Sequence, residues 1–76
     1  TNAFNLYPNP AKNDFVNISS NRSGSIQVQA FDILGKQVIN GSVANGRLNI
    51  SNLNTGIYIV KLTQEAATVT KKLIVQ

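Results

Sequence analysis

Residues 56–63, Gly-Ile-Tyr-Ile-Val-Lys-Leu-Thr, decide the fold class of this 76-residue chain. The segment is rich in the β-branched and aromatic residues that favour strands, and it follows a polar loop ending in Gly56. Period-two alternation puts Tyr58, Val60 and Leu62 on one face, and Ile57, Ile59 and Lys61 on the other. A strand that is apolar on both faces is expected at the centre of a sheet or covered on its second side.

Other segments on both sides of residues 56–63 also have the length and pattern of strands. They are Phe15–Ser19, Ser25–Ala30, Lys36–Asn40, Arg47–Ile50 and Thr68–Val75. Ser25–Ala30 alternates strictly, with Ile26, Val28 and Ala30 inward and two glutamines toward water. Turn signals recur about every eight to twelve residues, which predicts about seven short strands. We therefore expect an all-β, seven-stranded antiparallel sandwich of immunoglobulin-like character, with a small open barrel as the alternative.

Turn residues separate these strands. Asp32-Ile33-Leu34-Gly35 is predicted to close a β-hairpin, because Asp32 accepts hydrogen bonds from the following backbone and Gly35 adopts a positive φ. Asn40-Gly41 and Asn45-Gly46 are predicted as two further turns. Gln64–Ala67 is predicted to turn the chain into its last strand.

The composition argues against an enzyme. The chain has no His and no Cys, which removes the commonest general base and every thiol nucleophile. Its three acids, Asp14, Asp32 and Glu65, fall in three different predicted turns, so no carboxylate pair is expected across a cleft. Asn9, Asn13 and Asp14 together offer one carboxylate, a poor charge complement for Ca²⁺. We predict no catalytic residue, no metal and no cofactor.

The basic residues argue against nucleic acid as a partner. The formal net charge is +4, from seven Lys and Arg against three acids. Only Lys71 and Lys72 are adjacent, whereas nucleic-acid binders gather basic residues along one face with aromatics between them. No apolar run approaches the roughly 18 residues that span a membrane, so no membrane insertion is expected.

Motifs in a fixed order point to a known family. They are Leu6-Tyr7-Pro8-Asn9-Pro10-Ala11, Phe31-Asp32-Ile33-Leu34-Gly35-Lys36-Gln37-Val38, Leu53-Asn54-Thr55-Gly56-Ile57-Tyr58 and Lys71-Lys72-Leu73-Ile74-Val75. Taken together, their order and spacing resemble the type A C-terminal sorting domain of type IX secretion cargo in Bacteroidetes. The resemblance covers essentially the whole chain.

This resemblance implies that the chain is a sorting signal. Family members direct an N-terminally fused cargo from the periplasm through an outer-membrane translocon, after which a sortase typically removes the domain at the cell surface. The absence of a signal peptide at Thr1–Pro10 then suggests a piece of a longer precursor. We expect residues 1–76 to form one domain, with residues 1–5 as a remnant of the linker to the cargo.

Site residues follow from the resemblance by position. Lys71, Lys72, Leu73, Ile74 and Val75 match the family's terminal motif, and we hypothesise that the translocon recognises this strand by strand addition. The purely structural interpretation is a terminal strand that only completes the sheet, since Lys residues commonly occur on edge strands and protect them from further pairing. Other family positions are Leu6, Tyr7, Pro8, Asn9, Pro10, Asp32, Gly35, Lys36, Gly56 and Tyr58. Backbone geometry accounts for Gly35 and Gly56, and packing accounts for Tyr58.

Two alternatives to a sorting signal stay open: a carbohydrate-binding or surface-adhesion module attached to a secreted enzyme, and a structural spacer. Sugar binding would need exposed coplanar aromatics. Tyr58 is expected in the core and Phe15 and Phe31 over core strands, which leaves Phe4 and Tyr7 as exposed contacts. Phe4, Tyr7 and Phe31 lying together on one exposed face would favour this module.

Overall fold

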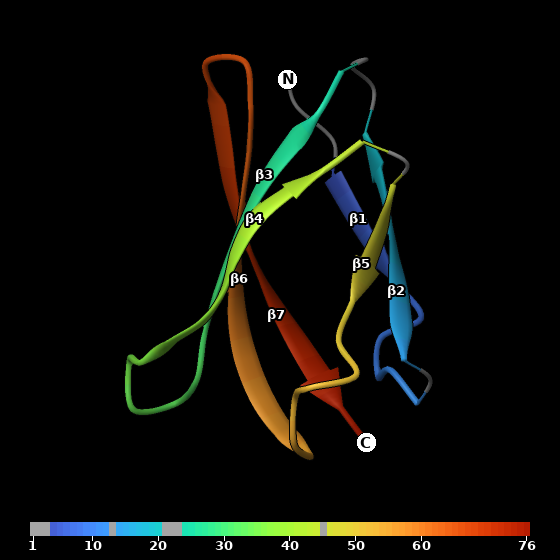
Figure 1. Ribbon diagram of the computed structural model, residues 1–76, viewed down its shortest axis with the longest axis vertical. Coiled ribbons are helices and arrows are strands. Elements are labelled where there is room, and N and C mark those ends of the chain that lie inside the picture. The colour runs from blue at the N-terminus through green and yellow to red at the C-terminus, as the bar shows by residue number, and fades with distance from the viewer. Residues whose placement is uncertain (1–3, 13, 21–23, 45) are drawn as a thin grey trace.

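Two antiparallel sheets face each other across one apolar core (Figure 1). The structure is a computed structural model that describes residues 4–12, 14–20, 24–44 and 46–76. Its strands are β1 (Phe4–Tyr7), β2 (Phe15–Ser20), β3 (Ile26–Phe31), β4 (Gln37–Val43), β5 (Arg47–Asn49), β6 (Gly56–Gln64) and β7 (Ala67–Val75). Their order is β1-β2-β5 in one sheet and β4-β3-β6-β7 in the other. The predicted seven-stranded sandwich is confirmed.

Strand β6 holds the larger sheet together. It pairs with β3 from Gln27↔Thr63 to Phe31↔Ile59, and with β7 along its whole length from Gly56↔Val75 to Gln64↔Ala67. Tyr58, Val60 and Leu62 are buried as predicted. The strand is central, as expected, but Ile57 and Ile59 on its second face are 46% and 41% exposed.

The core lies between the two sheets. Its largest fully buried side chains are Leu62, Leu73, Val16, Val28 and Val60. The predicted alternation of β3 is confirmed, because Ile26, Val28 and Ala30 are buried. Leu48 in β5 and Ile50 just after it are buried as well.

One buried polar side chain joins the two sheets. Gln64, at the end of β6, is 2% exposed. Its Nε2 donates to the Gly24 carbonyl at 2.9 Å, and its Oε1 accepts a hydrogen bond from the Ser20 hydroxyl of β2. Gln64 is buried with its hydrogen-bonding groups satisfied, as a buried amide requires.

Two expectations from the sequence are wrong. Asn40-Gly41 is no turn, because both residues lie within β4, where Gly41 pairs with Val28. The backbone of Gly41 is extended, so an Asn-Gly pair is tolerated there without reversing the chain. Phe4 is no exposed contact: it begins β1 and is 2% exposed within the core. A four-residue strand that starts the chain gives little periodic signal, so its burial follows only from pairing with β2.

Strand direction alternates along the chain. Neighbouring strands in both sheets are antiparallel, and Figure 1 shows each strand running opposite to the one before it. The β1–β2, β3–β4 and β5–β6 connections therefore lie at the same end as the C-terminus, and Phe4 lies at the opposite end. We call the end that carries these three connections and the C-terminus the motif end. Within the described residues, no helix has the length and apolar character needed to cross a membrane.

Candidate recognition site

The four sequence motifs come together at the motif end of the sandwich. The first motif leads into the β1–β2 connection, the second forms the β3–β4 turn, and the third forms the β5–β6 connection and the start of β6. The terminal motif ends β7 beside them (Figure 1). Four segments that are far apart in the sequence, the first at residues 6–11 and the last at 71–75, thus meet at one end of the molecule.

The terminal motif lies on an edge strand whose side chains alternate between two faces. Leu73 and Val75 point into the core and are 0% and 6% exposed. Lys71 is on the same face and half-buried, whereas Lys72 is exposed and Ile74 half-buried on the outer face. The side chains of Lys72, Ile74 and Lys71 are therefore the parts of this motif that are accessible on the folded domain.

Part of the β7 edge is already occupied by the first motif. The Asn9 side chain donates from Nδ2 to the Lys72 carbonyl at 2.8 Å and accepts from the Ile74 N–H at 3.0 Å. Ala11 continues the pairing: its N–H donates to the Ile74 carbonyl at 2.7 Å, and its carbonyl accepts from the Gln76 N–H at 2.8 Å. We call residues 8–11 the Asn9 loop. It acts as a short extra strand along residues 72–76.

The rest of the β7 edge has no such cover. Bonding at Lys72, Ile74 and Gln76 shows that even-numbered residues turn their backbone groups away from β6. Thr68 and Thr70 share this orientation, and in the described part of the chain no strand pairs with them from the outside. Strand addition on the folded domain is thus open at 68–70 and closed at 72–76.

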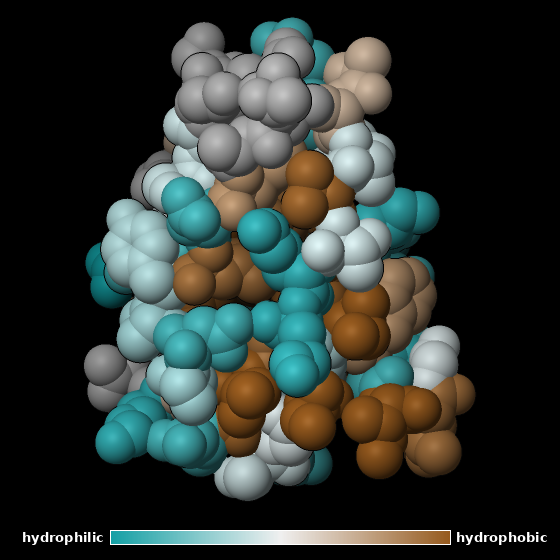
Figure 2. All heavy atoms as spheres, turned by 180° about the vertical axis from the view of Figure 1, so that it is seen from behind, coloured by the Kyte–Doolittle hydropathy of each residue, from teal (hydrophilic) through white to brown (hydrophobic). Residues whose placement is uncertain are grey.

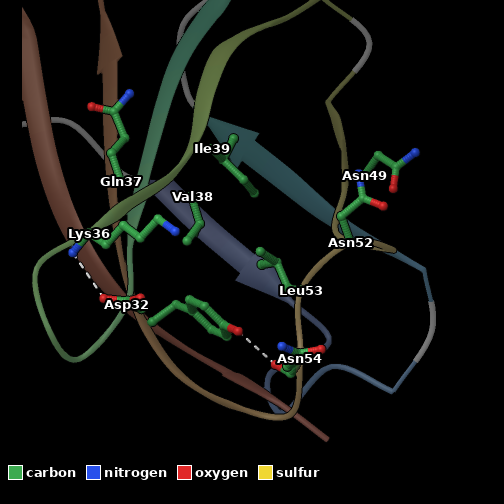
Figure 3. Close-up of a pocket in the computed structure, with 10 residues that line it drawn as sticks. Asp32, Lys36, Gln37, Val38, Ile39, Asn49, Asn52, Leu53 and Asn54 are labelled. Carbon is green, nitrogen blue, oxygen red and sulfur yellow. Dashed lines mark hydrogen bonds between the residues drawn. The ribbon is translucent and has the colours of Figure 1, made fainter.

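The β3–β4 turn is fixed by one carboxylate and displays two apolar side chains. Asp32 Oδ1 accepts from the N–H group of Leu34 at 2.9 Å. It also accepts from the N–H group of Lys36 at 2.9 Å (Figure 3). The Gly35 N–H donates to the Asp32 carbonyl at 3.0 Å, and Gly35 has φ +86°. This confirms the predicted turn mechanism. Ile33 and Leu34 at its tip are 80% and 88% exposed.

A groove opens between this turn and the β5–β6 connection (Figure 3). It encloses about 470 Å³ and has amide side chains on its rim with Val38, Ile39, Leu53 and Tyr58 as its apolar part. Tyr58 is 7% exposed, and its hydroxyl donates to the Asn54 carbonyl at 2.7 Å, which anchors the connection to β6. Tyr58 therefore has the packing role expected of it, and Gly56 begins β6 opposite Val75.

The aromatic platform of a sugar-binding module is not assembled. Phe4 is in the core, and Phe31 is on the outer face of the other sheet. Tyr7 is 51% exposed on β1, as expected, while Phe15 is 40% exposed and lies under the Arg47 guanidinium, 4.5 Å from ring centroid to Cζ.

The oxygen ligands considered for a cation have other partners or lie outside the described residues. The Asn9 amide oxygen accepts from Ile74, the Asp14 carbonyl accepts from the Ile50 N–H, and Asn13 is not among the described residues. No group of three or more His, Cys, Asp or Glu residues occurs in the part of the chain that the structure describes.

Sequence reasoning missed two features of this end. The pairing of Asn9 with β7 joins residues 63 and 65 positions apart, and no local pattern indicates such a contact. The exposure of Ile33 and Leu34 could have been predicted from the sequence. They are the central residues of a four-residue turn between Asp32 and Gly35, which is too short to place their side chains on the core.

The model of a family described as "Secretion system C-terminal sorting domain" matches residues 5–76. No curated protein matches the chain.

Proposed function

We propose that this chain, which belongs to the family of secretion system C-terminal sorting domains, is the signal by which an outer-membrane translocon exports a larger cargo. The family supports a sorting signal of the type IX secretion system, fused to cargo and destined for the cell surface or the extracellular space. Transit through the periplasm, recognition by the translocon, removal by a sortase and the absence of any catalytic role are our inferences for this chain. The linker to the cargo is predicted at residues 1–5, and this boundary stays a prediction. Phe4 and Asn5 of this range lie in β1.

One observation carries this proposal: the family match extends over 5–76, and the motifs that match the family gather at one end of the sandwich. A spacer has no need for such a gathering. A sugar-binding module would need its aromatics on one exposed face. Here Phe4 lies in the core and Phe31 lies on the outer face of the larger sheet.

We propose that the terminal motif is recognised through its outward side chains. Lys71, Lys72 and Ile74 are accessible to different extents, whereas Leu73 and Val75 stabilise the core. Strand addition along the terminal motif would require displacement of the Asn9 loop from residues 72–76. Side-chain recognition needs no such displacement.

A secretion assay tests the proposal. The domain is fused behind a periplasmic fluorescent reporter in a type IX-competent strain and in the same strain without the translocon. Export that needs both the domain and the translocon supports the sorting role. A reporter that folds but stays in the periplasm in both strains would reject it, and glycan binding would be tested next.

Point variants locate the signal better than truncation, because removal of β7 takes Leu73 and Val75 out of the core and unfolds the domain. Lys71→Gln with Lys72→Gln is expected to reduce export while the melting transition is kept. Lys12→Gln, an exposed Lys outside β7, is the matched control. The mass of the exported reporter shows whether the domain has been removed, and retention of the whole domain would contradict the sortase step.

A further inference from the structure

The outer face of the larger sheet is apolar at the motif end. Ile57 and Ile59 are 46% and 41% exposed there, and Phe31 and Ile74 are half-buried. The register sets these side chains in two neighbouring rows: Ile57 beside Ile74, then Phe31 beside Ile59 beside Lys72. Side chains directly opposite on one face of a sheet touch, so the rows form a continuous surface.

The same face becomes polar toward the other end. The next rows are Gln29, Lys61 and Thr70, and then Gln27, Thr63 and Thr68. At the motif end the surface continues into the β3–β4 turn, where Ile33 and Leu34 are the most exposed of the large apolar side chains. Figure 2, the view from behind, shows apolar groups projecting at lower right, where this turn lies after the half-turn from Figure 1. We call Phe31, Ile33, Leu34, Ile57, Ile59 and Ile74 the apolar plate.

The charged groups bordering the plate on the sheet are both cationic. Lys72 ends one of its rows and Lys61 stands in the next row, and both are exposed. Among the described residues of this face there is no Asp or Glu. The nearby Asp32 carboxylate is engaged by the N–H groups of its own turn. A complementary surface therefore has an apolar centre and carboxylates at its rim.

We propose that the apolar plate binds a protein of the sorting machinery whose own surface is apolar at the centre and acidic at the rim. This inference rests on the proposed function and names the chemistry of the partner. A protein fits better than a lipid surface, because the plate passes directly into rows of Gln and Thr on the same flat sheet. An apolar centre with a polar rim of this kind is the usual anatomy of a protein interface.

Polar β-branched variants of the plate test the apolar part. Ile57→Thr with Ile59→Thr keeps β-branched residues in β6 and is expected to lower reporter export about tenfold or more, as loss of central apolar anchors does. Gln27→Thr with Gln29→Thr, in the polar rows of the same face, is the matched control and is expected to export normally. Thermal melts confirm that all variants fold.

Charge reversal tests the acidic rim. Lys61→Glu is expected to lower export strongly, whereas Lys12→Glu makes the same change of net charge outside the larger sheet and leaves export unchanged. Equal losses for the two variants would show that only net charge matters and would overturn the proposed rim.

The outcomes separate this inference from the proposed function. If the unaltered domain exports the reporter and the plate variants do so equally well, the plate is not the interface and the sorting role stands. If the unaltered domain fails to export, both proposals fall. Sedimentation that shows a dimer dissociated by the plate variants would assign the plate to self-association. Flotation with vesicles of phosphatidylglycerol and phosphatidylcholine, lost in the plate variants, would assign it to a membrane; either result overturns the proposal.

Discussion

At the scale of single residues, the motif positions have separate structural tasks. Asn9 pairs with the backbone of a strand that follows it by more than sixty residues, Asp32 fixes a turn, and Tyr58 anchors the loop before its own strand. Each of these side chains replaces a backbone hydrogen bond that the local chain does not provide. Such tasks account for these residues whether or not a partner also contacts them.

Asn9 is expected to stabilise the end of β7. Asn9→Ala removes the hydrogen bonds to the Lys72 carbonyl and the Ile74 N–H, with an expected loss of about 1 to 2 kcal/mol in the free energy of unfolding. Urea denaturation measures this loss, and Asn40→Ala, at an exposed Asn in β4, is the control. Faster exchange of the Ile74 amide in Asn9→Ala would locate the effect; unchanged exchange would show that the pairing does not protect this edge.

Three glycines are expected to respond differently to Ala. Gly46 has φ +73°, and an added Cβ would stand 3.0 Å from the Ile18 carbonyl oxygen, so Gly46→Ala combines backbone strain with a clash. Gly35 has φ +86° in open space, so Gly35→Ala costs the strain alone, about 1 to 2 kcal/mol. Gly41 is extended and unobstructed, and Gly41→Ala is expected to be neutral or stabilising by about 0.5 kcal/mol.

Chemical denaturation of these three variants gives the order directly. Stability is expected to fall in the order Gly41→Ala, Gly35→Ala, Gly46→Ala. A Gly46→Ala variant as stable as Gly35→Ala would mean that β2 moves away from the added methyl group.

At the scale of elements, most strands followed from the sequence, but the presence of β1 and the full length of β4 did not. Ile26, Val28 and Ala30 alternate with polar residues, so β3 has a recognisable pattern, and the length of the apolar run identifies β6. Phe4–Tyr7 is too short for a period, and the Asn-Gly pair in β4 imitates a turn. Pairing with β2 places β1, and pairing with β3 keeps the Asn-Gly pair of β4 extended. The sequence of one strand does not indicate which strand it pairs with.

The candidate site was predictable only in part. The terminal motif was located on an edge strand, which is confirmed, and the Asp32 turn has the expected hydrogen bonds. Which face of β7 is buried was open, because Lys71 and Lys72 interrupt the alternation. Register with β6 settles this, since Leu73 lies opposite the buried Tyr58.

The link between the two sheets is expected to depend on Gln64. Gln64→Ala removes the hydrogen bonds to the Gly24 carbonyl and from the Ser20 hydroxyl and opens space in the core, at a cost of about 2 to 4 kcal/mol. Gln27→Ala, on the outer face of β3, is the control and is expected to change stability by less than about 0.5 kcal/mol. A midpoint shift in Gln64→Ala no larger than the control's would show that the sheets are held by apolar packing alone.

At the scale of the whole molecule, the two ends differ in what they contribute. The motif end carries the four sequence motifs, the groove and the apolar plate, while the opposite end carries the start of β1 and the β6–β7 turn. Added chain is therefore expected to have different effects at the two ends.

A ten-residue Gly-Ser segment placed after Gln76 is expected to reduce export, because Gln76 pairs with Ala11 beside the terminal motif. The same segment inserted between Glu65 and Ala66, at the far turn, is expected to leave export unchanged. The secretion assay compares the two. Equal export from both would mean that access to the motif end does not limit recognition.

The number of strands has a consequence for the cargo. Seven alternating crossings, an odd number, bring the chain in at one pole of the sandwich and out at the other. With an even number of strands, a protein fused before the first strand would lie at the pole that carries the motifs and would cover them. With odd parity, a passenger fused before β1 lies at the other pole of the sandwich, so the proposed recognition surface stays clear. The same signal therefore suits passengers of unrelated shape.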